Sequence, residues 1–138
     1  MIIEKRPGEN ILETETMHIC FAVNIEGSNT AGFARSVVGE WWPELINIGP
    51  CEPGTVLEKD HDGIRYHALV CHSQFTANGG WTKTPEWLAQ CLDSIETTDP
   101  LSIIAIGTGI NGKILHADWN AIKNAMETSS KHIVLYGE

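Results

Sequence analysis

The first candidate for chemistry is a glycine-rich stretch that follows the apolar residues 103–106 and precedes a helical pattern beginning near Asp118. A strand, a glycine-rich loop and a helix in this order expose backbone N–H groups to a phosphate. Glycine lets the backbone come close, and the helix N-terminus favours an anion. A strand-to-helix turn that binds nothing remains the alternative, because a G-x-G-x-x-G string alone is weak evidence. The predicted binding residues here are Gly107, Thr108, Gly109, Ile110, Asn111 and Gly112.

A second loop of the same kind lies earlier in the chain, between the apolar residues 18–23 and another helical pattern. Asn29 or Thr30 can cap that helix by accepting an N–H bond. If the two preceding strands are parallel neighbours, both loops lie at the carboxyl edge of the sheet, where open α/β sheets bind ligands. Two such loops side by side suit a diphosphate better than a single phosphate. The predicted binding residues here are Asn24, Gly27, Ser28, Asn29, Thr30, Ala31 and Gly32.

His72 directly follows the apolar residues 69–71 and is therefore expected at the same edge. It could act there as an acid or a base, although a plain solvated histidine fits the pattern equally well. Nucleophilic catalysis finds no support, because G-x-S-x-G is missing from the sequence and the neighbours Cys71 and His72 point to opposite faces of a strand. The six histidines show no metal-binding spacing, so we expect neither a metal nor a cofactor.

Composition limits the classes of partner. The 138 residues form one predicted domain, residues 1–138, with a net charge of −9. Nine Lys and Arg residues are spread thinly, which argues against nucleic acid as a partner. Four cysteines without a C-x-x-C pair indicate reduced thiols. With no signal-peptide core and no apolar run of membrane-spanning length, we expect a soluble cytoplasmic protein without a membrane partner. The oligomeric state stays open.

The elements that must position these loops follow from periodicity and turn signals. The pattern predicts an α/β protein, with a mixed sheet and helices on both of its faces. A hairpin is expected around the Asp62-Gly63 turn, and Pro43 should end the first helix. Thr84 is the expected cap of the second helix, with Pro85 in its first turn. In chain order we expect strand or loop 11–17, strand 18–23, helix 31–42, loop 47–54, hairpin strands 55–59 and 64–71, loop 72–83, a helix from Thr84, strand and loop 102–112, helix 117–130 and strand 132–136.

Several of these segments together resemble the macro domain, an ADP-ribose-binding family, and are most similar to its branch that includes the terminal ADP-ribose protein glycohydrolase. The resemblance covers nearly the whole chain and implies a three-layer α/β/α macro-domain-like fold with a central mixed sheet. It also implies ADP-ribose or an ADP-ribosyl derivative as the ligand. The segments that carry it are Gly8-Glu9-Asn10-Ile11, residues 18–24 with Ala31-Gly32-Phe33-Ala34, Gly54-Thr55-Val56-Leu57, and residues 106–112 closed by Asp118-Trp119.

Residue roles follow from this resemblance. The acid of the family's opening Gly-Asp-(Leu/Ile) motif binds the adenine amino group, and Glu9 stands in its place, followed by Asn10 and Ile11. The second loop would wrap the diphosphate and the distal ribose. In the glycohydrolase branch a lysine and an aspartate perform the chemistry, whereas this chain has His72 and Asn111 at those places. Histidine does not readily form the lysine-type sugar adduct, and an amide is not a carboxylate base.

The resemblance therefore implies ADP-ribose binding more directly than it implies the glycohydrolase mechanism, and several functions stay open. The chain is either a binder of ADP-ribose or a hydrolase that acts at the distal ribose. An ADP-ribose 1''-phosphate phosphatase using His72, Asn24 and Asn111 is one form of the enzyme reading. A nicotinamide-dinucleotide oxidoreductase is a further alternative, because the G-x-G-x-x-G string precedes a helix and a strand that ends near Glu138.

Overall fold

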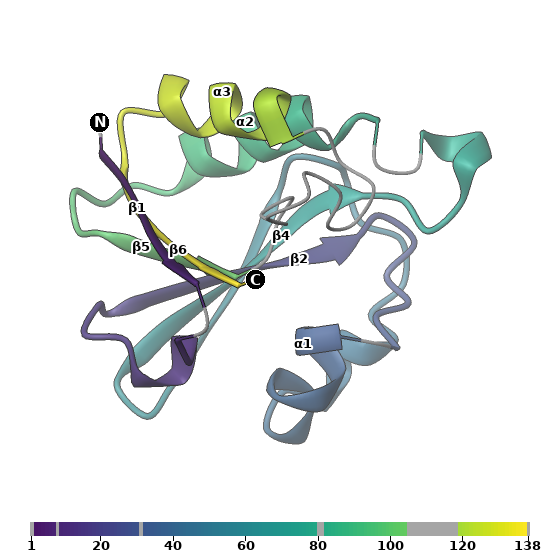
Figure 1. Cartoon of the computed structure of the whole chain (residues 1–138). Helices are drawn as coiled ribbons and strands as arrows, with labels where there is room; N and C mark the ends of the chain where they lie inside the picture. The colour runs from purple at the N-terminus through teal and green to yellow at the C-terminus, as the bar shows by residue number, and fades with distance from the viewer. Residues whose placement is uncertain (1, 8, 31, 80–81, 105–118, 138) are drawn as a thin grey trace.

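The computed structural model describes residues 2–7, 9–30, 32–79, 82–104 and 119–137 (Figure 1). The second glycine-rich loop, residues 107–112, and Ala31 lie outside the described residues. The strands are β1 (Ile2–Pro7), β2 (His18–Asn24), β3 (Val56–His61), β4 (Ile64–His72), β5 (Leu101–Ile104) and β6 (His132–Gly137). The α-helices are α1 (Gly32–Ser36), α2 (Thr84–Ser94) and α3 (Trp119–Thr128), and the 3-10 turns are η1 (Ile11–Glu13), η2 (Val38–Glu40), η3 (Pro43–Ile46) and η4 (Thr76–Asn78).

The described strands form one mixed sheet in the order β1-β6-β5-β2-β4-β3. Every pairing is parallel except that of β3 with β4, which is the expected hairpin. Asp62 and Gly63 form its turn with φ of +49° and +79°, as a tight hairpin turn requires. The register of β2 on β4 shifts after Val23, so that Asn24 pairs with His72. Two predicted site residues therefore end adjacent strands at the carboxyl edge of the sheet.

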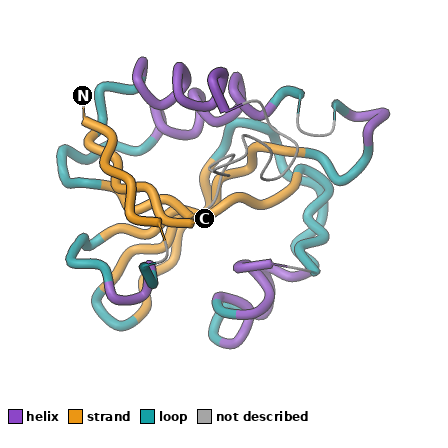
Figure 2. The backbone as a smooth tube through the Cα atoms, viewed as in Figure 1, coloured by secondary structure: helices purple, strands orange, loops and turns teal. Residues whose placement is uncertain are grey.

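Helices cover both faces of this sheet, which confirms the predicted three-layer α/β/α class (Figures 1 and 2). Side chains on β2 alternate between two cores: Cys20 packs with the residues of α2 and α3, and Phe21 packs with those of α1 and η2. Leu88 of α2 and Ile122 of α3 are both 0% exposed in the first core. Over the described residues, none of the helices is long and apolar enough to cross a bilayer.

The first helix is shorter than expected. The pattern predicts a helix over 31–42, whereas α1 ends at Ser36 and two 3-10 turns follow. Val37 and Val38 are β-branched and weaken helix propagation. A Cβ at Gly39 would lie 3.1 Å from the Ala34 carbonyl oxygen, so glycine permits the chain to fold tightly back at this point. The expectation of one continuous helix was wrong because local packing outweighs the apolar spacing.

Two further differences concern the helix starts and the first strand. α2 begins at Thr84 with Pro85 in its first turn, but Lys83 takes the cap position that we expected for Thr84. The Thr84 hydroxyl is buried without a hydrogen-bond partner among the described residues. Strand β1 was missed. The segment 11–17, which we expected to be strand or loop, contains the turn η1 and then loop.

Candidate functional site

A cavity of about 270 Å³ opens at the carboxyl ends of β2 and β4. It unites residues that were predicted from two separate motifs, the first loop and the end of the hairpin strand. The lining also includes Ala22, Ala34 and Gln74, none of which was predicted to bind a ligand. The predicted residues that the structure brings together here are Asn24, Ser28, Asn29, Thr30 and His72.

Two buried asparagines give the first loop its shape. Asn24 donates from Nδ2 to the Ser28 carbonyl at 2.8 Å and accepts the Ser28 N–H at Oδ1 at 3.1 Å. Asn29 accepts the Asn24 N–H at 3.0 Å and donates to the Leu45 carbonyl at 2.9 Å. Asn29, at 5% exposure, therefore fastens the loop, which is not the helix-capping role that we expected for it or Thr30. Because Asn24 uses both of its polar groups in the loop, its side chain shapes the site.

The first loop is also bound to residues 46–51, a support that the sequence pattern did not reveal. The Asn29 N–H donates to the Ile46 carbonyl at 2.7 Å, and the Cys51 N–H donates to the Ile25 carbonyl at 2.8 Å. Gly27, with φ of +72°, lies directly against Gly49, whose N–H donates to the Gly27 carbonyl at 3.3 Å. These bonds hold the loop in one conformation before any ligand arrives.

Glu26 connects the first loop to the segment after β4. Its carboxylate accepts from Ser73 Oγ at 2.6 Å, from the Gln74 N–H at 2.9 Å and from Asn78 Nδ2 at 3.2 Å. Burial opposes ionisation, but these hydrogen bonds outweigh it and lower the pKa of Glu26 below its ordinary value. The sequence gives no sign of these bonds, because they join Glu26 to residues about 50 positions away.

His72 is a neutral imidazole at neutral pH. Burial lowers its pKa to about 4, although the nearby Glu26 carboxylate opposes that shift. A neutral ring can donate one hydrogen bond and accept another, but it carries no proton to give as a general acid near pH 7. The geometry therefore equips His72 to orient a ligand hydroxyl or to serve as a weak base.

The buried thiols offer no nucleophile. Cys20, Cys71 and Cys91 are each 0% exposed. Burial raises the pKa of all three, in Cys91 to about 12, so that they stay protonated. Among the described residues, no group of three or more His, Cys, Asp and Glu side chains is placed to hold a metal ion.

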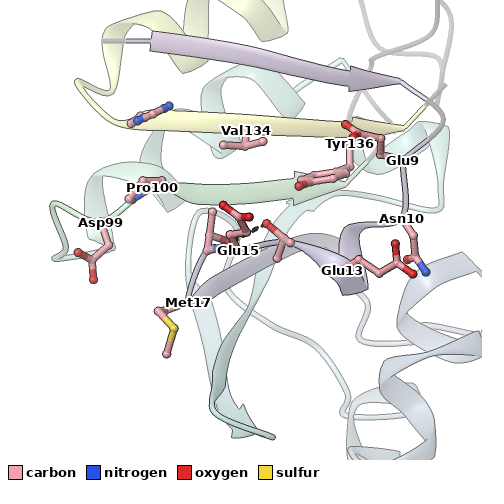
Figure 3. A pocket seen from close by; sticks show the side chains of 12 residues that line it. Glu9, Asn10, Glu13, Glu15, Met17, Asp99, Pro100, Val134 and Tyr136 are labelled. Atoms are coloured by element: carbon pink, nitrogen blue, oxygen red, sulfur yellow. Dashed lines mark hydrogen bonds between the residues drawn. The ribbon is translucent and has the colours of Figure 1, made fainter.

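Glu9, the predicted adenine-binding acid, and Asn10 line a second, larger cavity of about 890 Å³ over β5 and β6 (Figure 3). Glu9 lies beside Tyr136 at one end of it. Asn10 caps η1 by accepting the Leu12 N–H at 3.0 Å, and Ile11 is 2% exposed in the core, so these two serve the turn that presents Glu9. Gly32 begins α1. Asn111 and the rest of 107–112 lie outside the described residues.

A mixed sheet between two helical layers, with a shaped loop at the strand ends, is a three-layer α/β/α architecture. No protein-family model matches the sequence, and no curated protein matches it. A protein of unknown function from Bacteroides thetaiotaomicron is similar in structure, with a TM-score of 0.73 and 12% identity over 100% of this chain and 99% of that one. A macrodomain protein from Streptomyces coelicolor has a TM-score of 0.68 at 13% identity, over 97% of both chains. A mutant macrodomain of Oceanobacillus iheyensis with ADPR has a TM-score of 0.62 at 17% identity, over 99% of this chain and 82% of that one. The chain therefore has the macrodomain fold.

Proposed function

We propose that this protein binds ADP-ribose or a related ADP-ribosyl derivative. The observation that supports this most is the conformation of the first loop at the carboxyl ends of β2 and β4. Hydrogen bonds of Asn24 and Asn29 shape this loop, and further bonds hold it against residues 46–51. A loop ordered in advance binds at a lower entropic cost. The fold, shared with a macrodomain that was solved with ADPR, supports the same ligand class here.

The orientation follows from the two cavities. The diphosphate and distal ribose would lie at the first loop near His72, and the adenine would lie toward Glu9, as the resemblance to macro domains implies. Glu9 and Tyr136 at the end of the larger cavity support this assignment, because a carboxylate accepts from an amino group and an aromatic ring can contact a base. Residues 107–112 are proposed to complete the diphosphate site, on the resemblance alone.

Hydrolysis at the distal ribose, including removal of a 1''-phosphate, is the second candidate, and the position of His72 in the cavity of the first loop favours it. Two observations favour binding over turnover. The neutral His72 has no proton to donate to a leaving group, and Asn24 spends both polar groups within the loop. The glycohydrolase-type lysine and aspartate are also replaced, by His72 and Asn111.

Calorimetric titration with ADP-ribose, with AMP and NAD as comparators, tests the proposal. We expect saturable binding of ADP-ribose at micromolar concentration, or roughly −8 kcal/mol. AMP should bind more weakly because it lacks the second phosphate and the distal ribose. Tighter binding of NAD would favour the oxidoreductase alternative, and no binding of any of the three would contradict the proposal.

Glu9→Ala is expected to weaken ADP-ribose binding about tenfold, since a hydrogen bond to a charged group contributes about 1.5–3 kcal/mol. Binding of ribose 5-phosphate, which has no adenine, should not change. Titration of both ligands against both proteins measures the difference. Glu52→Ala, an exposed acid away from both cavities, is the matched control. An equal loss for both ligands would mean that Glu9 does not recognise adenine.

His72→Ala separates the binder from the enzyme. If the protein is a binder, we expect ADP-ribose affinity to fall by about threefold or less, because the variant loses one hydrogen bond between neutral groups. Hydrolysis of ADP-ribose 1''-phosphate by the unaltered chain should stay at the background rate, followed by release of inorganic phosphate. Measurable turnover that disappears in His72→Ala and persists in His61→Ala would establish the phosphatase in place of the binder.

A further inference from the structure

The cavity of the first loop has no cationic side chain among its described lining residues. These eight residues are apolar or polar and include neither Lys nor Arg. His72, which has the one titratable side chain among them, is uncharged at neutral pH because burial lowers its pKa to about 4. A negative charge lies beside the lining, since Glu26 Oε1 accepts the Gln74 N–H at 2.9 Å. A phosphate monoester that entered this cavity would lose its water without gaining a cation from these residues.

The backbone N–H groups beside the cavity are already used within the protein. The N–H groups of residues 24–29 all donate internally, two of them to asparagine side chains, three to backbone carbonyls and that of Glu26 to its own carboxylate. The Gln74 N–H donates to the same carboxylate. Loops that bind phosphate do so through free N–H groups. Residues 24–29 and 74 therefore offer none to a phosphate at the distal ribose, and the diphosphate of the proposed ligand must be bound by other N–H groups.

The groups that remain for a ligand are neutral. The side chains of Ser28, Thr30 and Gln74 line the cavity, and none of the described residues forms a hydrogen bond with their polar ends. Hydroxyl and amide groups both donate and accept, so they match the hydroxyl and ether oxygens of a sugar. The backbone of Gln74 is held in place because the Glu26 carboxylate also accepts from Ser73 Oγ and Asn78 Nδ2, at 2.6 and 3.2 Å.

We propose that the cavity of the first loop selects ADP-ribose whose distal C1'' carries an uncharged group over ADP-ribose 1''-phosphate, with Gln74 as a specificity-determining residue. The uncharged group is the free hydroxyl or a neutral link. This inference rests on the proposed function, which places the distal ribose near His72. The Gln74 amide bonds the sugar oxygens, and the Glu26 carboxylate beside it repels a phosphate. The net charge of −9 acts in the same direction.

The test is calorimetric titration of the full chain with ADP-ribose, its 1''-phosphate and its uncharged 1''-O-methyl derivative. We expect ADP-ribose to bind about tenfold more tightly than the 1''-phosphate and within about threefold of the methyl derivative. Gln74→Ala should weaken ADP-ribose binding about threefold, because it removes one hydrogen bond between neutral groups. Gln74→Lys places a cation at the cavity and should raise the affinity for the 1''-phosphate about tenfold relative to that for ADP-ribose.

Gln90→Lys is the matched control, because it makes the same change at an exposed position outside both cavities. An equal gain in that control would mean that net charge decides the selectivity, and not the position of Gln74. A methyl derivative that binds as weakly as the 1''-phosphate would point to size instead of charge and overturn the proposal. A 1''-phosphate that binds as tightly as ADP-ribose would also overturn it, while leaving ADP-ribose binding intact. If none of the three ligands binds, the proposed function itself fails.

Discussion

Gly27→Ala is expected to lower the free energy of unfolding by about 3 kcal/mol or more, from backbone strain and overlap combined. A Cβ at Gly27 would overlap the Gly49 carbonyl and lie 2.6 Å from the Gly49 nitrogen. Both partners are backbone atoms, so no side chain can rotate away to relieve the contact. The φ of +72° adds a conformational cost for any residue with a Cβ. Urea-induced unfolding, followed by circular dichroism, measures the change.

Gly49→Ala is the matched control for that prediction. Gly49 also has a positive φ, of +87°, but a Cβ there would meet nothing within 4 Å. Gly49→Ala should therefore lower the free energy of unfolding by about 1 kcal/mol, from the unfavourable backbone conformation alone. If the two variants lose the same stability, the close approach of the first loop to residues 46–51 is not what requires glycine at position 27. ADP-ribose affinity should fall in Gly27→Ala and stay nearly unchanged in Gly49→Ala.

Acidification is expected to destabilise the fold between about pH 6.5 and pH 4, through the buried His67 and the half-buried His72. Burial lowers the pKa of His67 and of His72 to about 4, against an ordinary value of 6.5. Between pH 6.5 and pH 4 the unfolded chain therefore binds more protons than the folded chain. The stability that comes from the neutral histidines is fully present above pH 6.5 and is lost as the pH falls toward 4. Each histidine contributes at most about 3 kcal/mol, from 1.36 kcal/mol per pKa unit. Urea unfolding across this pH range measures the slope.

The variant His67→Gln tests which group is responsible. His67 is 1% exposed, its Nε2 lies 2.9 Å from His18 Nδ1, and its Nδ1 lies 3.1 Å from Glu58 Oε2. Glutamine can form hydrogen bonds but does not titrate. Below pH 6.5, the slope of the free energy of unfolding against pH should therefore decrease by the contribution of about one proton. An unchanged slope in His67→Gln would contradict the assignment.

Periodicity and turn chemistry sufficed for most of the fold. The hairpin was predictable because Asp62-Gly63 requires a turn between two strand-like runs, and α2 because Leu88, Cys91 and Leu92 repeat at helical spacing. Strand β1 was missed because three charged residues in a row, 4–6, hide its pattern at the edge of the sheet. The break after α1 depends on the contact of Gly39 with Ala34, which spacing does not encode.

The candidate site also has a part that could be predicted from the sequence and a part that could not. Asn24 and His72 could be placed together in advance, because each ends an apolar strand and parallel strands end at one edge. The bonds from Glu26 to Ser73 and Asn78, and those from the first loop to residues 46–51, join distant positions and leave no local signal. Tyr136 also went unnoticed, since a tyrosine in a closing strand is ordinarily a core residue.

The pairing of β1 with β6 has a consequence for folding. Ile2 lies opposite His132 and Pro7 opposite Gly137, so the first described strand has its hydrogen-bonding partner in the last one. During synthesis, β1 must wait until residues 132–137 have left the ribosome before it can enter the sheet. Contacts of such long sequence separation slow folding. Meanwhile β2 and the hairpin of β3 and β4 can assemble, which makes the half of the sheet that carries the first loop the earlier half to form.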